Sequence, residues 1–213
     1  MPVENGNTEQ KRRGLETVST IVLSLATVLS SWCAFQASQW NGEQYFRIDD
    51  ENIADNKRLQ LEIAGVQRRA GESNYFLYYL DALGNGDKKK TDFLESGFPS
   101  HLKIALDKWK TMDPLHNPDA PRSPFLLPEY LVPETEDAKK FATEAAGFKQ
   151  LANQADRNSD NYLFLSIIIS MALFFTGLSG ITSSHRYKRM LILVPILIIS
   201  VVLIVLLRLP FII

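Results

Sequence analysis

The sequence predicts an all-α integral membrane protein with three transmembrane helices. Spans one and two are expected to extend into an antiparallel extracytoplasmic helical hairpin or bundle that carries a Pro-rich strap. Three apolar runs, at 18–35, 162–181 and 190–207, are each about long enough to cross a ~30 Å hydrocarbon core as a helix. The chain between the first two runs is mostly polar, and its apolar residues recur at helical spacing.

The basic residues that flank the spans predict the orientation in the membrane. They precede span one and fill the link between spans two and three, and they are Lys11, Arg12, Arg13, Arg186, Lys188 and Arg189, with His185 beside them. Short segments rich in Lys and Arg stay in the cytoplasm. We therefore expect residues 1–17 and 184–189 to be cytoplasmic, and residues 41–161 and the C-terminus to lie outside the inner (cytoplasmic) membrane.

The expected spans are 18–40, 162–183 and 190–213. Span one is expected to remain as an uncleaved anchor, because its apolar stretch is longer than a usual signal core and no small-x-small cleavage site follows it. The three apolar runs contain no Asp, Glu, Lys or Arg, which argues against an active transporter. Polar groups are costly in lipid, so those at the exit of span one are expected to make helix contacts: Gln36, Gln39, Trp40 and Gln44.

A long helix is expected to continue from span one to about Leu83, because residues 42–83 contain no proline and a Gly-Asn-Gly breaker follows at 84–86. Apolar and small residues recur along it at alternating spacings of four and three, at Leu59, Ile63, Val66, Ala70, Ser73, Leu77 and Leu80. We interpret this series as the face that packs against a returning helix.

The returning helix shows a heptad-like seam that runs into span two. The seam comprises Ala138, Phe141, Ala145, Phe148, Ala152, Ala155, Ser159 and Tyr162. Small alanines in such a seam let a partner helix approach closely. We expect helix contacts, within the chain or between subunits as a coiled coil, at Phe141, Ala145, Phe148 and Ala152.

The remaining part of the polar region is expected to hold one short helix and an irregular strap. An amphipathic pattern predicts a helix over Ser100–Met112. Six prolines in residues 113–133 exclude both a helix and a central strand. The strap is nevertheless rich in apolar residues, which predicts that it packs on the helices. Phe125, Leu126 and Tyr130 are candidates for a partner groove on it.

Two segments resemble a known family. Residues 32–44, WCAFQASQWNGEQ, resemble the pattern W-x-A-[FY]-Q-x-x-x-W-x-G-x-Q, and residues 113–121, DPLHNPDAP, with PEY at 128–130, resemble a second signature of the same group. That group is a family of prokaryotic membrane proteins with one N-terminal and two C-terminal spans. The resemblance covers essentially the whole chain and implies the three-span architecture. It implies no activity, because none is known for the family.

The sequence predicts no catalytic residues, no cofactor and no metal site, and we do not expect an enzyme. His101 and His116 lack a metal-ligand spacing, and no phosphate-binding loop or nucleophile elbow occurs. The acidic cluster at 49–55 is interpreted as a solvated face in preference to a cation site. The net charge of −1 gives no indication of nucleic-acid binding.

Three functions remain open at this level. The heptad seams and the apolar strap favour a non-enzymatic scaffold or accessory protein whose outer domain mediates self-association or partner binding. A hydroxyl-rich first span with an acidic, amide-rich exit would suit a passive pore or channel-like homo-oligomer. An extracytoplasmic sensor is the third, although few residues are available on the cytoplasmic side. The expected partners are membrane lipid and either further copies of the chain or another membrane or extracytoplasmic protein.

Overall fold

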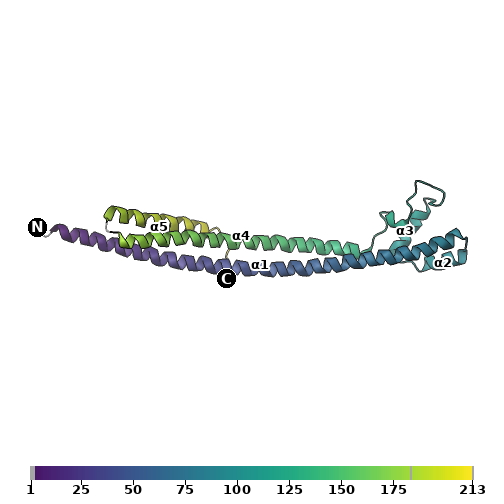
Figure 1. Cartoon of the computed structure of the whole chain (residues 1–213), viewed down its shortest axis with the longest axis horizontal. Helices are drawn as coiled ribbons and strands as arrows, with labels where there is room; N and C mark the ends of the chain where they lie inside the picture. The colour runs from purple at the N-terminus through teal and green to yellow at the C-terminus, as the bar shows by residue number, and fades with distance from the viewer. Residues whose placement is uncertain (1–2, 183, 213) are drawn as a thin grey trace. The chain divides into compact units, whose positions relative to one another are not determined.

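The computed structural model describes residues 3–182 and 184–212, apart from the side chains of residues 3–9, 11, 12 and 185. All regular structure in this part of the chain is helical, as expected (Figure 1). The elements are α1 (Val3–Gly84), α2 (Lys88–Ser96), α3 (Ser100–Lys110), the 3₁₀ turn η1 (Pro124–Leu126), α4 (Pro133–Ile181) and α5 (His185–Leu206). The side chains of Lys11, Arg12 and His185, which entered the prediction of orientation, lie outside the described residues.

Three helices are long and apolar enough to cross a membrane. The qualifying segments lie in α1, α4 and α5, at Arg13–Gly84, Pro133–Ile181 and Arg186–Leu206. This confirms the three candidate spans. The chain also divides into two compact units. We call residues 1–48 with 149–213 the membrane unit, and Asp49–Phe148 the central unit.

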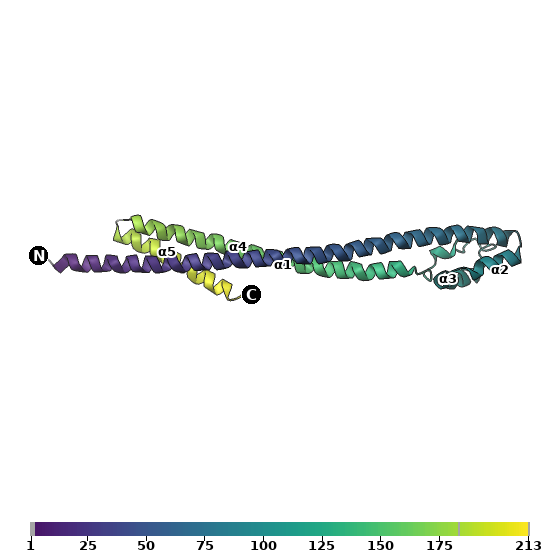
Figure 2. The ribbon, with the colours of Figure 1, turned by 90° about the horizontal axis from the view of Figure 1, so that it is seen from below.

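In the membrane unit, α1 and α4 run antiparallel and α5 packs on them. The hydroxyl of Ser159 donates to the carbonyl of Ala37 at 2.9 Å, and the two serine pairs that continue this register are Ser30–Ser166 at 3.3 Å and Ser19–Ser179 at 3.0 Å. Figures 1 and 2 both show α5 beside α4. Apolar side chains from all three helices form one cluster, which includes Val22, Ala26, Ile169, Ile199 and Val202.

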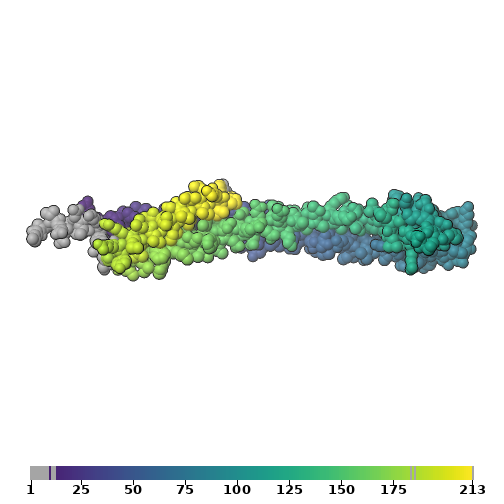
Figure 3. All heavy atoms as spheres, turned by 90° about the horizontal axis from the view of Figure 1, so that it is seen from above, coloured from purple at the N-terminus to yellow at the C-terminus, as the bar shows by residue number. Residues whose placement is uncertain are grey.

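In the central unit, the core forms where α1, α2, α3 and the strap meet. The ring of Phe76 lies 5.4 Å from that of Trp109 and 5.5 Å from that of Phe125, in edge-to-face geometry. The same face of α3 buries Leu102 and Leu106, which confirms the amphipathic helix expected from Ser100. Figure 3 shows α3 and the strap as a compact mass of teal atoms.

The helix α2 was not expected from the sequence. Gly86 adopts a positive φ of 70°, and the side chain of Asp87 then caps the helix by accepting from the backbone N–H of Lys90 at 3.0 Å. This turn ends the long helix α1 at Gly84, where the Gly-Asn-Gly breaker predicted its end. The helix adds Leu94 to the core.

The prediction of which face of α1 packs against α4 is wrong. Ile63, Val66 and Leu77 are 57%, 70% and 62% exposed. The buried positions of α1 in this unit include Ala54, Gly65, Glu72 and Phe76 instead. The reason is close approach, since a Cβ on Gly65 would lie 3.2 Å from Oγ1 of Thr135 in the first turn of α4. The buried face of α1 therefore contains a small residue, Gly65, and a polar residue, Glu72, whereas the apolar pattern had predicted burial of a different face.

The seam expected on α4 is confirmed. Its buried alanines and tyrosine are Ala138, Ala145, Ala152, Ala155 and Tyr162, while Phe141, Phe148 and Ser159 are half-buried. The helix begins at Pro133, and the strap before it is irregular apart from η1, as its prolines predicted. The strap packs on the helices through Pro124, Phe125, Leu127, Tyr130 and Val132.

Candidate functional site

The polar residues at the end of span one hold the segment that follows α5. Gln36 is fully buried, and its side chain donates to the carbonyl of Ile212 at 2.8 Å and accepts from the N–H of Ile212 at 3.0 Å. The indole N–H of Trp40 and the hydroxyl of Tyr162 both donate to the carbonyl of Pro210, each at 3.1 Å. Gln36 and Trp40 therefore make contacts within the chain.

The other two residues expected at this end are less enclosed, with Gln39 exposed and Gln44 half-buried. The hydroxyls of span one are also engaged by the chain itself. Ser19 and Ser30 bond to α4, and four further hydroxyls donate to the carbonyl four residues earlier on α1, at Thr20, Ser24, Thr27 and Ser31.

One buried carboxylate joins three elements of the central unit. Glu72 on α1 is 9% exposed. Nε2 of His101 on α3 lies 2.9 Å and 3.1 Å from its two oxygens, and the hydroxyl of Tyr130 on the strap donates to Oε2 at 2.7 Å. We call these three residues the Glu72 cluster. Each of the three side chains has a hydrogen-bond partner within the cluster, as is usual for buried polar groups.

The surroundings of the Glu72 cluster keep Tyr130 protonated. Burial, and then the hydrogen bond to Glu72, raise the pKa of the Tyr130 phenol well above its usual range. The guanidinium of Arg69 lies 5.9 Å from the centre of the Tyr130 ring, and it donates to the carbonyl of Phe125 at 3.3 Å. The polar atoms are directed at one another, so the cluster is built to fix the strap on α1 and α3.

Sequence reasoning missed this cluster. Glu72 lies 29 residues from His101 and 58 from Tyr130, so no short motif contains the three. The available signal was Glu72 itself, a carboxylate on the same helical face as Gly65 and Phe76. That signal requires knowing which face of α1 is buried.

A second polar contact joins α1 to the start of α4. The guanidinium of Arg68 forms hydrogen bonds with both carboxylate oxygens of Glu134. These bonds lower the pKa of Glu134 below its usual value, because they favour the charged carboxylate. The pair lies beside Gly65, at the point where the two helices approach closely.

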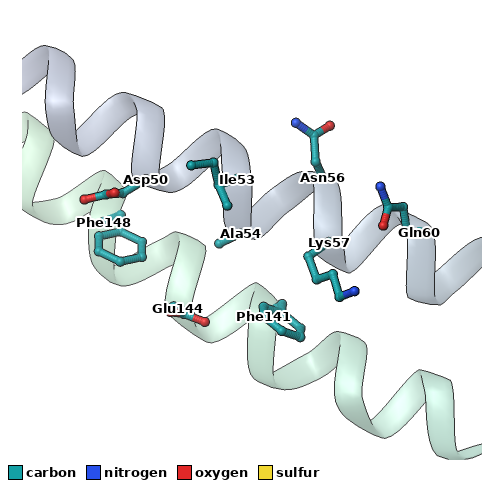
Figure 4. Close-up of a pocket in the computed structure, with 9 residues that line it drawn as sticks. All are labelled: Asp50, Ile53, Ala54, Asn56, Lys57, Gln60, Phe141, Glu144 and Phe148. Atoms are coloured by element: carbon teal, nitrogen blue, oxygen red, sulfur yellow. The ribbon is translucent and has the colours of Figure 1, made fainter.

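A groove runs between α1 and α4 in the central unit (Figure 4). It has a volume of about 620 Å³. In Figure 4 the rings of Phe141 and Phe148 extend from α4, and the side chain of Lys57 lies between the two helices. We call it the helix-pair groove, and its lining residues are Asp50, Ile53, Ala54, Asn56, Lys57, Gln60, Phe141, Glu144 and Phe148.

The helix-pair groove combines apolar surface with charges of both signs. Ile53 is 63% exposed, whereas Ala54 is buried. Lys57 and Glu144 place a cation and an anion on opposite helices. Phe141 and Phe148, expected as helix contacts, line this groove, while Ala145 and Ala152 are buried. Such a surface suits an amphipathic segment of a protein.

The strap contributes to a different cavity, of about 500 Å³, between α1, the strap and the first turns of α4. Phe125 and Tyr130, two of the expected groove residues, line it. Both side chains are only 9% exposed and belong to the core. The third residue, Leu126, is 64% exposed and is not among the residues that line this cavity.

Within the described residues, no group of three or more His, Cys, Asp or Glu side chains is arranged to hold a metal ion. His116 pairs with Asp113 at 2.9 Å, and both side chains are exposed. In the acidic cluster, Asp55 forms an ion pair with Arg58 at 2.8 Å.

No family model matches the chain, and no curated protein or solved structure matches it significantly. The resemblance to a family of three-span prokaryotic proteins therefore stays a prediction.

Proposed function

We propose that this chain is a non-enzymatic membrane scaffold or accessory protein whose central unit mediates self-association or partner binding. The observation that carries this proposal is apolar surface left uncovered on the central unit. Ile53, Ile63 and Val66 on α1 are each more than half exposed. The same unit closes a core of its own around Phe76 and Trp109.

Exposed apolar surface of this kind has a cost in water. Patches of large apolar side chains on soluble surfaces commonly mark sites of protein association. The exposed residues of the central unit lie beyond the 18–40 span, on the part of the chain rich in charged residues. Lipid does not cover them in this arrangement, so a protein surface is the natural cover.

The proposal includes the topology. Residues 41–161 form an extracytoplasmic helical hairpin, and residues 1–17 and 184–189 lie in the cytoplasm. Two features support it. Within the central unit, Arg68 of α1 meets Glu134 of α4 in an antiparallel pair of helices. Exposed Arg13 precedes the first apolar run, and exposed Arg186 and Arg189 lie just after the link between α4 and α5, as the positive-inside rule favours.

The passive pore receives less support from these observations. The hydroxyls that motivated a pore lining bond within the chain, as Ser19 does with Ser179 and Ser30 with Ser166. The hydroxyls of Thr20, Ser24, Thr27 and Ser31 donate to backbone carbonyls of their own helix, which satisfies them without water.

Native mass spectrometry of the full chain in mild detergent tests the proposal, with every co-purifying protein retained. We expect a discrete homo-oligomer or a defined complex with a different protein. A double variant, Ile53→Ser with Ile63→Ser, should weaken that complex. A control with the equally exposed Phe93→Ser and Leu115→Ser should keep it. A chain that remains a monomer without any partner contradicts the proposal.

A further inference from the structure

One face of α1 in the central unit carries a continuous series of residues, most of which are exposed, while Ser73 and Leu80 are half-buried. The residues of the series are spaced alternately by three and four residues, and they are Asn56, Leu59, Ile63, Val66, Ala70, Ser73, Leu77 and Leu80. We call this series the α1 stripe. Its large apolar members, Leu59, Ile63, Val66 and Leu77, are 41–70% exposed.

Most of the α1 stripe is separate from the surface that α1 uses inside its own unit, although Val66 borders the cavity beside the strap and Leu80 packs against the core. Positions 54, 65, 72 and 76 pack toward α4, α3 and the strap. At about 100° per residue, Leu59, Ile63 and Ala70 lie on the opposite side of the helix from these positions. In this unit α1 therefore has two different faces. The buried face contains small, polar and aromatic residues, and the other face is apolar and mostly exposed.

We propose that the α1 stripe pairs with the α1 stripe of a second copy of this chain, with the two α1 helices parallel. This inference rests on the proposed function and names its partner and its contact surface. Alternating spacings of three and four produce the seam of a left-handed coiled coil, in which each seam residue packs against its counterpart. A seam of this kind is self-complementary under a two-fold axis.

The proposed pairing is parallel because α1 also contains a membrane span, which fixes the direction of the helix in the membrane. The same helix α1 contains an apolar segment able to cross the membrane. All copies that insert with one orientation present α1 in the same direction, and confinement to one membrane raises their effective concentration. An antiparallel pair of α1 helices would need two copies of opposite orientation.

The charges beside the α1 stripe are compatible with parallel pairing. In such a pair, the residue before each a position faces the residue after the d position of the other helix. Asp55 then faces Gln60 of the second copy, and Glu62 faces Gln67 of the second copy, so each of these contacts brings a charge to an amide. At the next two such positions the side chains stay in their own unit, because Arg69 donates to the carbonyl of Phe125 and Phe76 is buried in the core.

The seam residues indicate a reversible dimer. Ile63 is β-branched at an a position, which favours two strands, and Asn56 at the preceding a position favours one register. Ala70 and Ser73 in the middle of the stripe bury little apolar surface. The pair is therefore strongest near Leu59–Val66 and weaker toward Gly84.

Cysteine cross-linking in membrane vesicles tests the contact directly. Cys33 is the only cysteine of the chain and is buried in span one, so Cys33→Ala gives a background without thiols. Ile63→Cys and Val66→Cys are each added to this background. The matched control is Gly71→Cys, an exposed position beside the stripe where an added Cβ meets no described atom within 4 Å.

A disulfide needs Cα atoms within about 7 Å, which the seam of a parallel pair provides and its outer positions do not. We expect oxidised dimers of Ile63→Cys and Val66→Cys on non-reducing gels, with several-fold higher yield than for Gly71→Cys. As a second measurement, Val66→Glu with Leu77→Glu should remove the homodimer in native mass spectrometry while helical circular dichroism is retained.

The outcomes separate this inference from the proposed function. A homo-oligomer, or a complex with a different protein, in which the stripe cysteines cross-link no better than Gly71→Cys overturns the inference and leaves the proposed function standing. A monomer with neither cross-links nor a partner overturns both.

Discussion

At Glu72, a single carboxylate links α1 to α3 and to the strap. His101 and Tyr130 bind its two oxygens, and little of the group is exposed to water. Removing one partner leaves the other groups buried without their full set of hydrogen bonds, which costs more than the bond itself contributes. The strap is irregular, so these side-chain bonds, together with its apolar packing, determine its position.

The substitution Tyr130→Phe tests this role at the residue scale. It should reduce the free energy of unfolding by about 1.5–3 kcal/mol, because a hydrogen bond to a buried carboxylate is lost. Thermal unfolding in mild detergent, followed by circular dichroism, measures the effect. The control is Tyr78→Phe, since Tyr78 is 63% exposed and should tolerate the change. Equal stability of the two variants would mean that the Glu72 cluster does not hold the strap.

The Glu72 cluster also shows which contacts could not be predicted from the sequence. His101 was visible as a histidine without a metal-ligand spacing, but its carboxylate partner lies 29 positions away. Tyr130 was predicted as part of a partner groove because it lies in an apolar strap. In the structure Tyr130 lines a cavity beside the strap, and its burial against Glu72 also makes it part of the core. Such pairings depend on tertiary contacts, which a single sequence does not specify.

At the scale of elements, α4 and α1 differ in how well their patterns predicted burial. The seam of α4 is continuous and rich in alanine, and the structure buries it as expected. On α1, the most regular apolar series is the exposed one. The buried face contains Gly65 and Glu72, because close approach and a polar link decide the packing there. Periodicity predicted both helices correctly, but it could not show which of two faces of α1 is the buried one.

The substitution Gly65→Leu tests the close approach of α1 and α4. A side chain there meets Thr135 and Val132, so the helices must separate, at a cost of about 1–3 kcal/mol for overpacking. Gly71→Leu is the matched control, because that position is open and leucine is the better helix former by roughly 0.5–1 kcal/mol. Pulse proteolysis of the full chain measures both. A stable Gly65→Leu variant would show that the two helices are not closely packed at this point.

At the scale of the whole molecule, three apolar runs were enough to predict three candidate spans, since hydropathy and length are properties of the sequence itself. The sides of the membrane that we propose follow from the excess of Lys and Arg in the short flanking segments. The parallel pairing that we propose for the α1 stripe requires every copy of α1 to insert in one direction. The proposed assembly therefore depends on a uniform orientation in the membrane.

Labelling with a membrane-impermeant maleimide tests the topology, with single cysteines in the Cys33→Ala background. Lys89→Cys on α2 and Tyr187→Cys at the start of α5 are both exposed positions. If the proposed topology holds, with the central unit outside and the basic link inside, Lys89→Cys reacts in intact spheroplasts and Tyr187→Cys reacts only after lysis. Denatured samples of both variants control for the reactivity of each thiol. The reverse pattern would place the central unit in the cytoplasm, where its exposed apolar surface would meet a different set of partners.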